Sequence, residues 1–172
     1  MRNLIFSILA AAFIFGSSSA ASAQEWLKLA PEGANFEVMM PGTAKESVEE
    51  GTGAFGAYKV YLYMVPTADT IYLIGYSDYS DPAKMDIKAE INANRDNFMK
   101  SWKEGKILTE KDIKLGTNPG LEFTAQVDGG RIATSRIIML GKRPYQLIAV
   151  TAAGADQSGV TKFLDSFKLT RK

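Results

Sequence analysis

The sequence predicts an α+β protein in which an antiparallel β-sheet of about six strands packs against a long central helix and a short C-terminal helix. Segments with alternating apolar and polar residues occur in neighbouring pairs separated by turn residues, which is typical of antiparallel hairpins. One longer segment, from Ile87 to Trp102, repeats its apolar residues at helical spacing. A shorter segment from Val160 to Phe167 does the same near the C-terminus.

The first 23 residues have the order of a secretory signal peptide. Arg2 precedes an apolar run from Leu4 to Phe15, and small residues then lead to Ala23. As a helix the run would span roughly 18 Å, which is short of the roughly 30 Å core of a bilayer. We therefore expect cleavage between Ala23 and Gln24 and a periplasmic or secreted product. Residues 24–172 would form a single domain without a membrane anchor.

Composition excludes several classes of function. The chain has no histidine and no cysteine, so disulfides, thiol catalysis, histidine general-base catalysis and zinc sites built from these residues are impossible. Without Arg2, basic and acidic residues number 19 each. This balance, with no long basic run, argues against a nucleic-acid partner or an anionic membrane. No motif indicates a cofactor or a metal site.

The first half of the mature chain predicts a strand and then a hairpin. The strand covers Asn35 to Met40 and stops at a Pro-Gly turn. The segment from Thr43 to Gly53 is acidic with few apolar residues, so we expect a solvated connection. The segments from Ala57 to Val65 and from Thr70 to Tyr79 are rich in β-formers and predict the two arms of an antiparallel hairpin.

A helix of about five turns is predicted to follow the hairpin. Asp81 is placed to cap its first turn, with Pro82 at a position that needs no N–H, and Gly105 is placed to end it. Apolar residues from Ile87 to Trp102 form one face. The rest of the helical wheel is predicted to carry polar residues, among them Lys88, Glu90, Asn92 and Asp96.

The second half predicts a meander of strands that ends in the short helix. Four strands are expected, over Ile107–Leu115, Leu121–Val127, Arg131–Leu140 and Tyr145–Thr151. The segment from Gly116 to Gly120 contains two glycines and a proline and predicts a loop. The Asp128-Gly129-Gly130 and Gly141-Lys142-Arg143-Pro144 segments predict turns.

The best candidates for recognition of a partner are tyrosines on the predicted hairpin. They alternate away from Val60 and Leu62 on the first arm and recur on the second. The candidate partner-binding residues are Tyr61, Tyr63, Tyr72, Tyr76 and Tyr79. Tyrosine offers rigid contact area with a polar tip, so a solvent-facing row would suit a partner. The alternative is that helices cover the sheet and bury these side chains.

Two other kinds of site are open at this point. Asp78, Tyr79 and Asp81 form the nearest group for carboxylate or tyrosine catalysis of the hydrolase or lyase type, although Asp81 is better explained as a helix cap. A cavity between sheet and helix, lined by residues such as Phe98 and Trp102, would instead carry a small apolar ligand.

Several short segments resemble, in order, a widespread set of uncharacterised exported bacterial proteins. The segments are Phe36–Gly42, Tyr76–Tyr79, Pro119–Glu122, Arg143–Leu147 and Phe163–Phe167. Those proteins look like members of the fold shared by the photosystem extrinsic P protein (PsbP-like) and the Mog-type Ran-binding proteins. The resemblance implies an antiparallel sheet between helices and a history of non-enzymatic binding and assembly roles. It carries no site residue and no partner to this chain.

These observations favour an exported, non-catalytic binding or assembly module whose partner is an unknown protein or a small apolar ligand. The alternatives are a carrier of a small apolar ligand in a cavity between sheet and helix, and a carboxylate- or tyrosine-based hydrolase or lyase.

Overall fold

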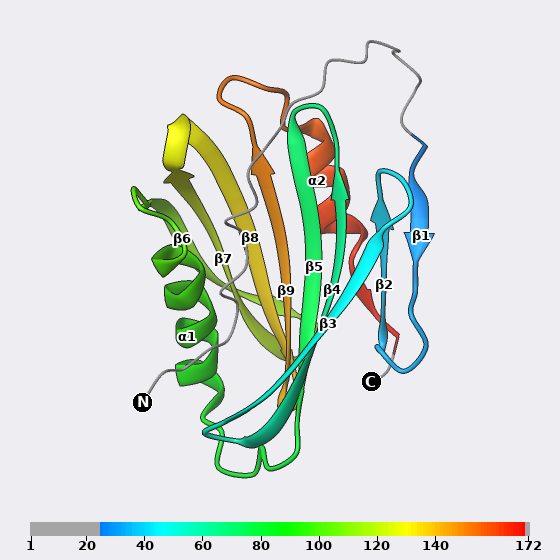
Figure 1. The fold of residues 1–172 in the computed structure, drawn as a ribbon, viewed down its shortest axis with the longest axis vertical. Coiled ribbons are helices and arrows are strands. Elements are labelled where there is room, and N and C mark those ends of the chain that lie inside the picture. Colours follow the sequence, from blue (N-terminus) through cyan, green and yellow to red (C-terminus); the bar gives the residue numbers. More distant parts are fainter. Residues whose placement is uncertain (1–24, 171–172) are drawn as a thin grey trace.

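A sheet of seven antiparallel strands organises the chain in a computed structural model that describes residues 25–170 (Figure 1). The strands lie in the order β3-β4-β5-β9-β8-β7-β6. Their bounds are β3 Lys45–Gly53, β4 Gly56–Pro66, β5 Thr70–Tyr79, β6 Lys106–Leu115, β7 Asn118–Val127, β8 Arg131–Leu140 and β9 Arg143–Thr151. The predicted signal peptide and its cleavage site at Ala23 and Gln24 lie outside the described residues.

Two helices and a second, smaller sheet cover the faces of the large sheet. Helix α1, Ile87–Lys100, lies on one side, and helix α2, Ser158–Ser166, lies on the other (Figure 1). The small sheet lies beside α2 and has the order β1-β2-β10. Its strands are β1 Leu27–Leu29, β2 Phe36–Met40 and β10 Lys168–Leu169. Within residues 25–170, neither helix has the length and apolar character that crossing a membrane requires.

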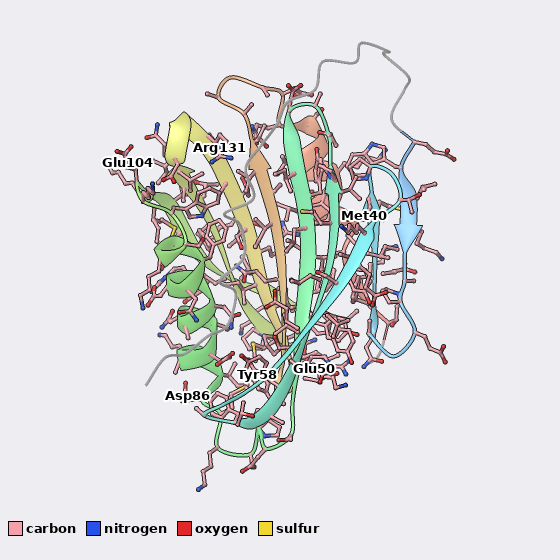
Figure 2. The ribbon with its side chains drawn as sticks, in the orientation of Figure 1. Met40, Glu50, Tyr58, Asp86, Glu104 and Arg131 are labelled. Carbon is pink, nitrogen blue, oxygen red and sulfur yellow. The ribbon has the colours of Figure 1, made fainter. Side chains whose placement is uncertain are left out.

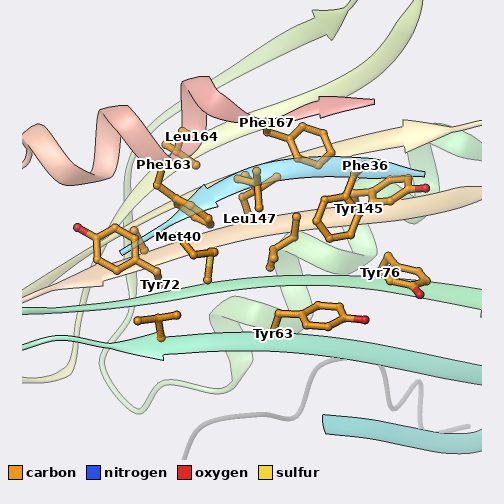
Figure 3. Packing of buried hydrophobic residues seen from close by; sticks show 14 of the residues in the cluster. Phe36, Met40, Tyr63, Tyr72, Tyr76, Tyr145, Leu147, Phe163, Leu164 and Phe167 are labelled. Atoms are coloured by element: carbon orange, nitrogen blue, oxygen red, sulfur yellow. The ribbon is translucent and has the colours of Figure 1, made fainter. Parts of the chain in front are cut away.

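Alternation along the strands divides the apolar residues between two cores. Val60 and Leu62 of β4 face α1, whereas Tyr63 and Val65 face α2 and the small sheet. We call the first the helix core and the second the aromatic core. The ring of Phe36 lies at the centre of the aromatic core (Figure 3). It makes edge contacts with three tyrosines at centroid distances of 5.9–6.3 Å: Tyr63, Tyr76 and Tyr145.

The structure confirms the α+β class and the predicted central hairpin. β4 and β5 pair antiparallel from Tyr58 opposite Tyr79 to Pro66 opposite Ile71. The predicted strand at β2, the meander from β6 to β9 and the short closing helix α2 are also present. Strands β1 and β10 were not predicted, because segments of three and two residues are too short to show a period.

The prediction of a solvated connection at Thr43–Gly53 is wrong, because most of this segment is strand β3. It pairs with β4 from Lys45 opposite Met64 to Gly53 opposite Gly56, and the large sheet therefore has seven strands where about six were predicted. β3 is an edge strand with almost every residue exposed. With no buried face it shows no alternation, and its charges suit an edge that must not pair with other chains.

The central helix is shorter than predicted at both ends. Its N-cap is Asp86, whose Oδ1 accepts a hydrogen bond from the Ala89 N–H at 2.8 Å, and Asp81 lies outside the helix. Ser101, not Gly105, ends the helix, and its hydroxyl donates to the Phe98 carbonyl at 2.6 Å. Trp102 still packs edge-on against Phe98, at a centroid distance of 5.8 Å, after the helix has ended. Because Trp102 is apolar and lies four residues after Phe98, the sequence pattern predicted a helix longer than the observed one.

The predicted loop at Gly116–Gly120 is also wrong in its second half, since β7 begins at Asn118. Pro119 and Gly120 are strand residues opposite Lys114 and Ile113 of β6. Gly120 is needed because a Cβ atom there would lie 2.3 Å from the Ile137 carbonyl oxygen on β8. The glycine therefore marks a close approach of two strands and not a turn. Likewise, β9 begins at Arg143, inside a segment that the sequence assigned to a turn.

The cap at Asp86 gives a direct test of where α1 begins. Replacing Asp86 by Ala removes the acceptor for the first turn and is expected to lower the free energy of unfolding by about 1 kcal/mol. Asp81→Ala is the matched control and should change it by less than about 0.5 kcal/mol. Urea denaturation followed by circular dichroism measures both. A larger loss at Asp81 than at Asp86 would contradict the helix start.

The close approach at Gly120 predicts an asymmetry between two strand glycines. Gly120→Ala should lower the free energy of unfolding by about 1–3 kcal/mol, because β8 must move away from the new methyl group. At Gly53 a Cβ would meet only ordinary contacts, at 3.6 Å from the Tyr58 ring. Gly53→Ala is therefore expected to be neutral within about 0.5 kcal/mol. Thermal unfolding measures the stability of the two variants. Equal losses in Gly120→Ala and Gly53→Ala would disprove this explanation.

Candidate ligand-binding cleft

A cleft of about 380 Å³ lies between the tip of the β3–β4 hairpin and the first turns of α1. Figure 2 shows Tyr58 and Asp86, one from each side of the cleft, at the same end of the molecule. Its volume falls in the range of small-molecule sites, and its surface is mostly apolar. It joins an aromatic wall to a buried acid, Glu90.

Three aromatic rings form one wall of the cleft. Phe55 and Tyr79 meet edge to face with ring centroids 5.6 Å apart, and Tyr58 lies 6.4 Å from Tyr79 at a tilt of 59°. The hairpin tip is fastened to the end of β5 by backbone hydrogen bonds from Ser80 to Ala57, at 2.8 Å, and from Asp81 to Phe55, at 3.0 Å. These bonds hold Phe55 over the Tyr79 ring.

Gly56 allows the hairpin tip to approach β5 this closely. Its φ of +79° lies in the region that favours glycine, and a Cβ atom there would lie 2.3 Å from the Ser80 hydroxyl oxygen. The position of the aromatic wall therefore depends on this residue as well as on the rings themselves.

A buried carboxylate, that of Glu90, lies at the α1 side of the cleft. Glu90 is only 5% exposed, and its Oε1 accepts hydrogen bonds from the Tyr79 hydroxyl at 3.0 Å and the Asn94 amide at 3.1 Å. Burial raises the pKa of Tyr79, and the charge and hydrogen bond of Glu90 raise it further. Tyr79 therefore stays protonated and donates to the carboxylate. No basic side chain of residues 25–170 forms an ion pair with Glu90.

Polar side chains at the rim add little positive charge. Asp86 is occupied as the N-cap of α1, Lys84 is exposed to solvent, and Asn97 is half-buried. Together with Glu90 they give the cleft two carboxylates and one ammonium group. Within the described residues, no group of three acidic side chains lies close enough to hold a metal ion.

The five tyrosines predicted to bind a partner do not share one surface. Tyr63, Tyr72 and Tyr76 are 4–5% exposed and belong to the aromatic core, which α2 and the small sheet cover. Tyr61 is half-buried and stacks on Tyr76 with centroids 4.7 Å apart. Burial is the first cause that raises the pKa of Tyr76 to about 12. Tyr79 alone reaches the cleft, because its odd position on β5 places it on the opposite face.

The predicted catalytic group is not brought together. The Asp78 carboxylate makes two hydrogen bonds to the Arg143 guanidinium, at 2.6 and 2.9 Å, on the face opposite to Tyr79. Asp81 is exposed. The residues suggested for an apolar cavity lie elsewhere, since Phe98 packs against Trp102 and against Phe123 in the helix core. Neither Phe98 nor Trp102 lines the cleft.

Sequence reasoning missed Phe55 and placed Glu90 on the wrong side of the helix. Glu90 and Asn94 lie within the buried stripe of α1, which the structure gives as Glu90, Ile91, Asn94 and Phe98. Their spacing of three and four residues from apolar neighbours was the available signal. It was overlooked because charged and amide side chains are ordinarily assigned to solvent.

Comparison with known proteins supports the fold but no family. No protein-family model and no curated protein sequence matches the chain. The solved structure of cyanobacterial PsbP (CyanoP) from Synechocystis sp. PCC 6803 is similar, with a TM-score of 0.58, 11% identity, and coverage of 90% of this chain and 98% of that chain. Protein PA94 of unknown function from Pseudomonas aeruginosa aligns at a TM-score of 0.39 and 11% identity, over 78% of this chain and 87% of its own.

The likeness to CyanoP confirms a PsbP-like fold, which the sequence resemblance had suggested. At 11% identity it establishes the fold alone.

The hydrogen bond from Tyr79 to Glu90 is expected to stabilise the protein. Tyr79→Phe leaves a buried carboxylate with one donor fewer and should lower the free energy of unfolding by about 1–3 kcal/mol. Tyr58 lines the same cleft, but no hydrogen bond of its hydroxyl to a described residue is seen. Tyr58→Phe is therefore the matched control, with an expected change below about 0.5 kcal/mol. Chemical denaturation that finds equal losses would show that Glu90 does not depend on this donor.

Proposed function

We propose that this chain is an exported, non-catalytic binding module that holds a small ligand in the cleft between the β3–β4 hairpin and α1. The observation that carries the proposal is the cleft itself, with three aromatic rings on one side and a buried, hydrogen-bonded carboxylate on the other. Concave sites of this volume, mostly apolar with a few fixed polar groups, are typical of small-molecule binding.

The arrangement favours binding over chemistry. The Glu90 carboxylate is held by Tyr79 and Asn94. Burial and the charge of Glu90 raise the pKa of Tyr79, so its hydroxyl stays protonated and is a poor nucleophile although it lies beside a carboxylate. A rigid polar group in an apolar site serves to orient a ligand and to select it. This binding role develops the carrier hypothesis, with the ligand at the N-terminal end of α1 and not beside Phe98 and Trp102.

Export belongs to the proposal on the strength of the N-terminal sequence. The charged, apolar and small-residue order that ends at Ala23 supports cleavage and release from the cytoplasm. The sequence resemblance to exported bacterial proteins of the PsbP-like and Mog-type fold agrees with this.

Native mass spectrometry of the exported protein tests the proposal. The full chain, made with its own signal sequence and recovered from the periplasm or medium, should begin at Gln24 and carry a small molecule that denaturation releases. Ala93→Phe places a ring in the cleft and is expected to displace that molecule. Ala153→Phe adds the same ring at an exposed loop position and should retain it.

Two results would contradict the proposal. A chain that stays uncleaved in the cytoplasm would overturn export. If the wild-type protein carries no small molecule, or if Ala93→Phe and Ala153→Phe carry it equally, the cleft is not a ligand site.

A further inference from the structure

We propose that the ligand of this cleft is an organic cation, a substituted ammonium ion whose alkyl groups contact the aromatic wall while its charge faces Glu90. This inference rests on the proposed function and names the chemical class of the ligand.

Glu90 carries a buried charge that no described side chain balances. A buried acid is ordinarily paired with a cation or coordinates a metal, because removing an ion from water is costly. Glu90 is 95% removed from solvent and lines the cleft, yet no basic side chain of the described residues pairs with it. Its Oε1 accepts both hydrogen bonds, and no bond of Oε2 to a described residue is seen. A cation in the cleft would satisfy that oxygen.

Two hydrogen bonds fix the position of the Glu90 carboxylate. Both the Tyr79 hydroxyl and the Asn94 amide donate toward Glu90, so the carboxylate acts as an acceptor in both bonds. Asn94 is 1% exposed and also donates to the Glu90 carbonyl at 2.9 Å, which fixes its amide in this orientation. The Glu90 side chain is therefore held in one position at the edge of the cleft.

The aromatic wall of the cleft suits a cation. The rings of Phe55, Tyr58 and Tyr79 stand at 84° and 59° to one another, so they partly enclose a space instead of forming a flat platform. The faces of aromatic rings carry partial negative charge and attract cations that lie within about 6 Å. A substituted ammonium also has apolar alkyl groups that suit such walls, whereas a metal ion would need several oxygen ligands.

The other charges around the site are consistent with a cation. Asp86 at the rim adds a second negative charge, and α1 keeps that side of the cleft open with small side chains at Ala89 and Ala93. Lys84 is the one basic residue that lines the cleft, and its side chain is exposed to solvent. Its ammonium group repels a bound cation weakly through water. Removal of the Lys84 charge should therefore strengthen cation binding, whereas removal of the Glu90 charge should weaken it.

Isothermal titration calorimetry on the mature protein, emptied by denaturation and refolding, tests the inference with two probes of the same shape. The probes are choline and its neutral isostere 3,3-dimethylbutan-1-ol. Choline is expected to bind at least about tenfold more tightly, which is the effect of a fixed opposite charge with aromatic contacts. Lys84→Gln should strengthen choline binding by about twofold to threefold, because it removes a like charge.

Glu90→Gln keeps the acceptor for Tyr79 and removes the charge, so it should weaken choline binding by about tenfold and abolish the preference over the isostere. Glu104→Gln changes an exposed carboxylate beyond the far end of α1 and should leave binding unchanged. Because Glu90→Gln could also disturb folding, Phe55→Leu provides a second variant outside the helix. Phe55→Leu is expected to weaken choline binding by about threefold to tenfold. The affinity for the neutral probe should change by less than about twofold.

The outcomes separate this inference from the proposed function. Equal binding of the two probes, or a preference for choline that survives Glu90→Gln, would overturn the cation assignment while the cleft remains a binding site. If neither probe binds, but the exported protein carries a small molecule that Ala93→Phe displaces, the cation inference is wrong and the proposed function stands. If Ala93→Phe displaces nothing and choline does not bind, both are wrong.

Discussion

Burial of the central strands on both faces is the constraint on which the rest of this structure depends. β5 is buried from Thr70 to Ser77, and β9 is buried from Pro144 to Thr151. Each residue of these strands must therefore fit one of two cores, and each face of the sheet needs its own cover. α1 covers one face, while α2 and the small sheet cover the other. The polar residues that fall within this region need partners of their own.

Those partners connect elements that are distant in the sequence. The Tyr145 hydroxyl donates to the Ala34 carbonyl at 2.8 Å, which holds the segment before β2 against the sheet. Thr70 and Thr151 pair their hydroxyls at 3.2 Å between β5 and β9. Arg143 reaches both Asp78 and the Gly33 carbonyl, so one guanidinium joins β5, β9 and the turn before β2. The small sheet is thereby held by polar contacts as well as by the packing of Phe36.

The elements that the sequence predicted correctly have at least one face that is buried or partly buried, and edge strand β6 is among them because Ile113 and Leu115 pack against the aromatic core. β4 shows a clear period because Val60 and Leu62 enter one core while Tyr63 and Val65 enter the other. β3 lies at an edge with both faces in water, and no pattern of hydrophobicity can reveal such a strand. Gly120 was misread for a different reason. A glycine required by close packing of two strands looks, in sequence, like one required by a turn.

The candidate cleft was harder to predict than the fold because its residues meet only through tertiary structure. Phe55 comes from a hairpin tip, Tyr79 from the last position of β5, and Glu90 from the first turn of α1. The sequence indicated Tyr79 as a partner-binding residue, but on the same surface as Tyr76. The period of two separates these neighbours, so that Tyr76 enters the aromatic core and Tyr79 faces α1. The alternation that builds the cores therefore also supplies one wall of the cleft.

Glu90 is where the sequence departs most from what stability alone would favour. It occupies a position in the buried stripe of α1 that a leucine would fill, next to Ile91 and one turn before Asn94. Two donors offset part of the cost of burying its charge, and the remaining cost is the kind of local conflict that proteins tolerate at functional sites. Tyr79 and Glu90 belong to both the cleft and the contact between sheet and helix. A ligand that pairs with Glu90 would bind only the folded state and would therefore stabilise the packing of α1 on the sheet. Binding of such a ligand would therefore be coupled to folding through this one hydrogen-bonded pair.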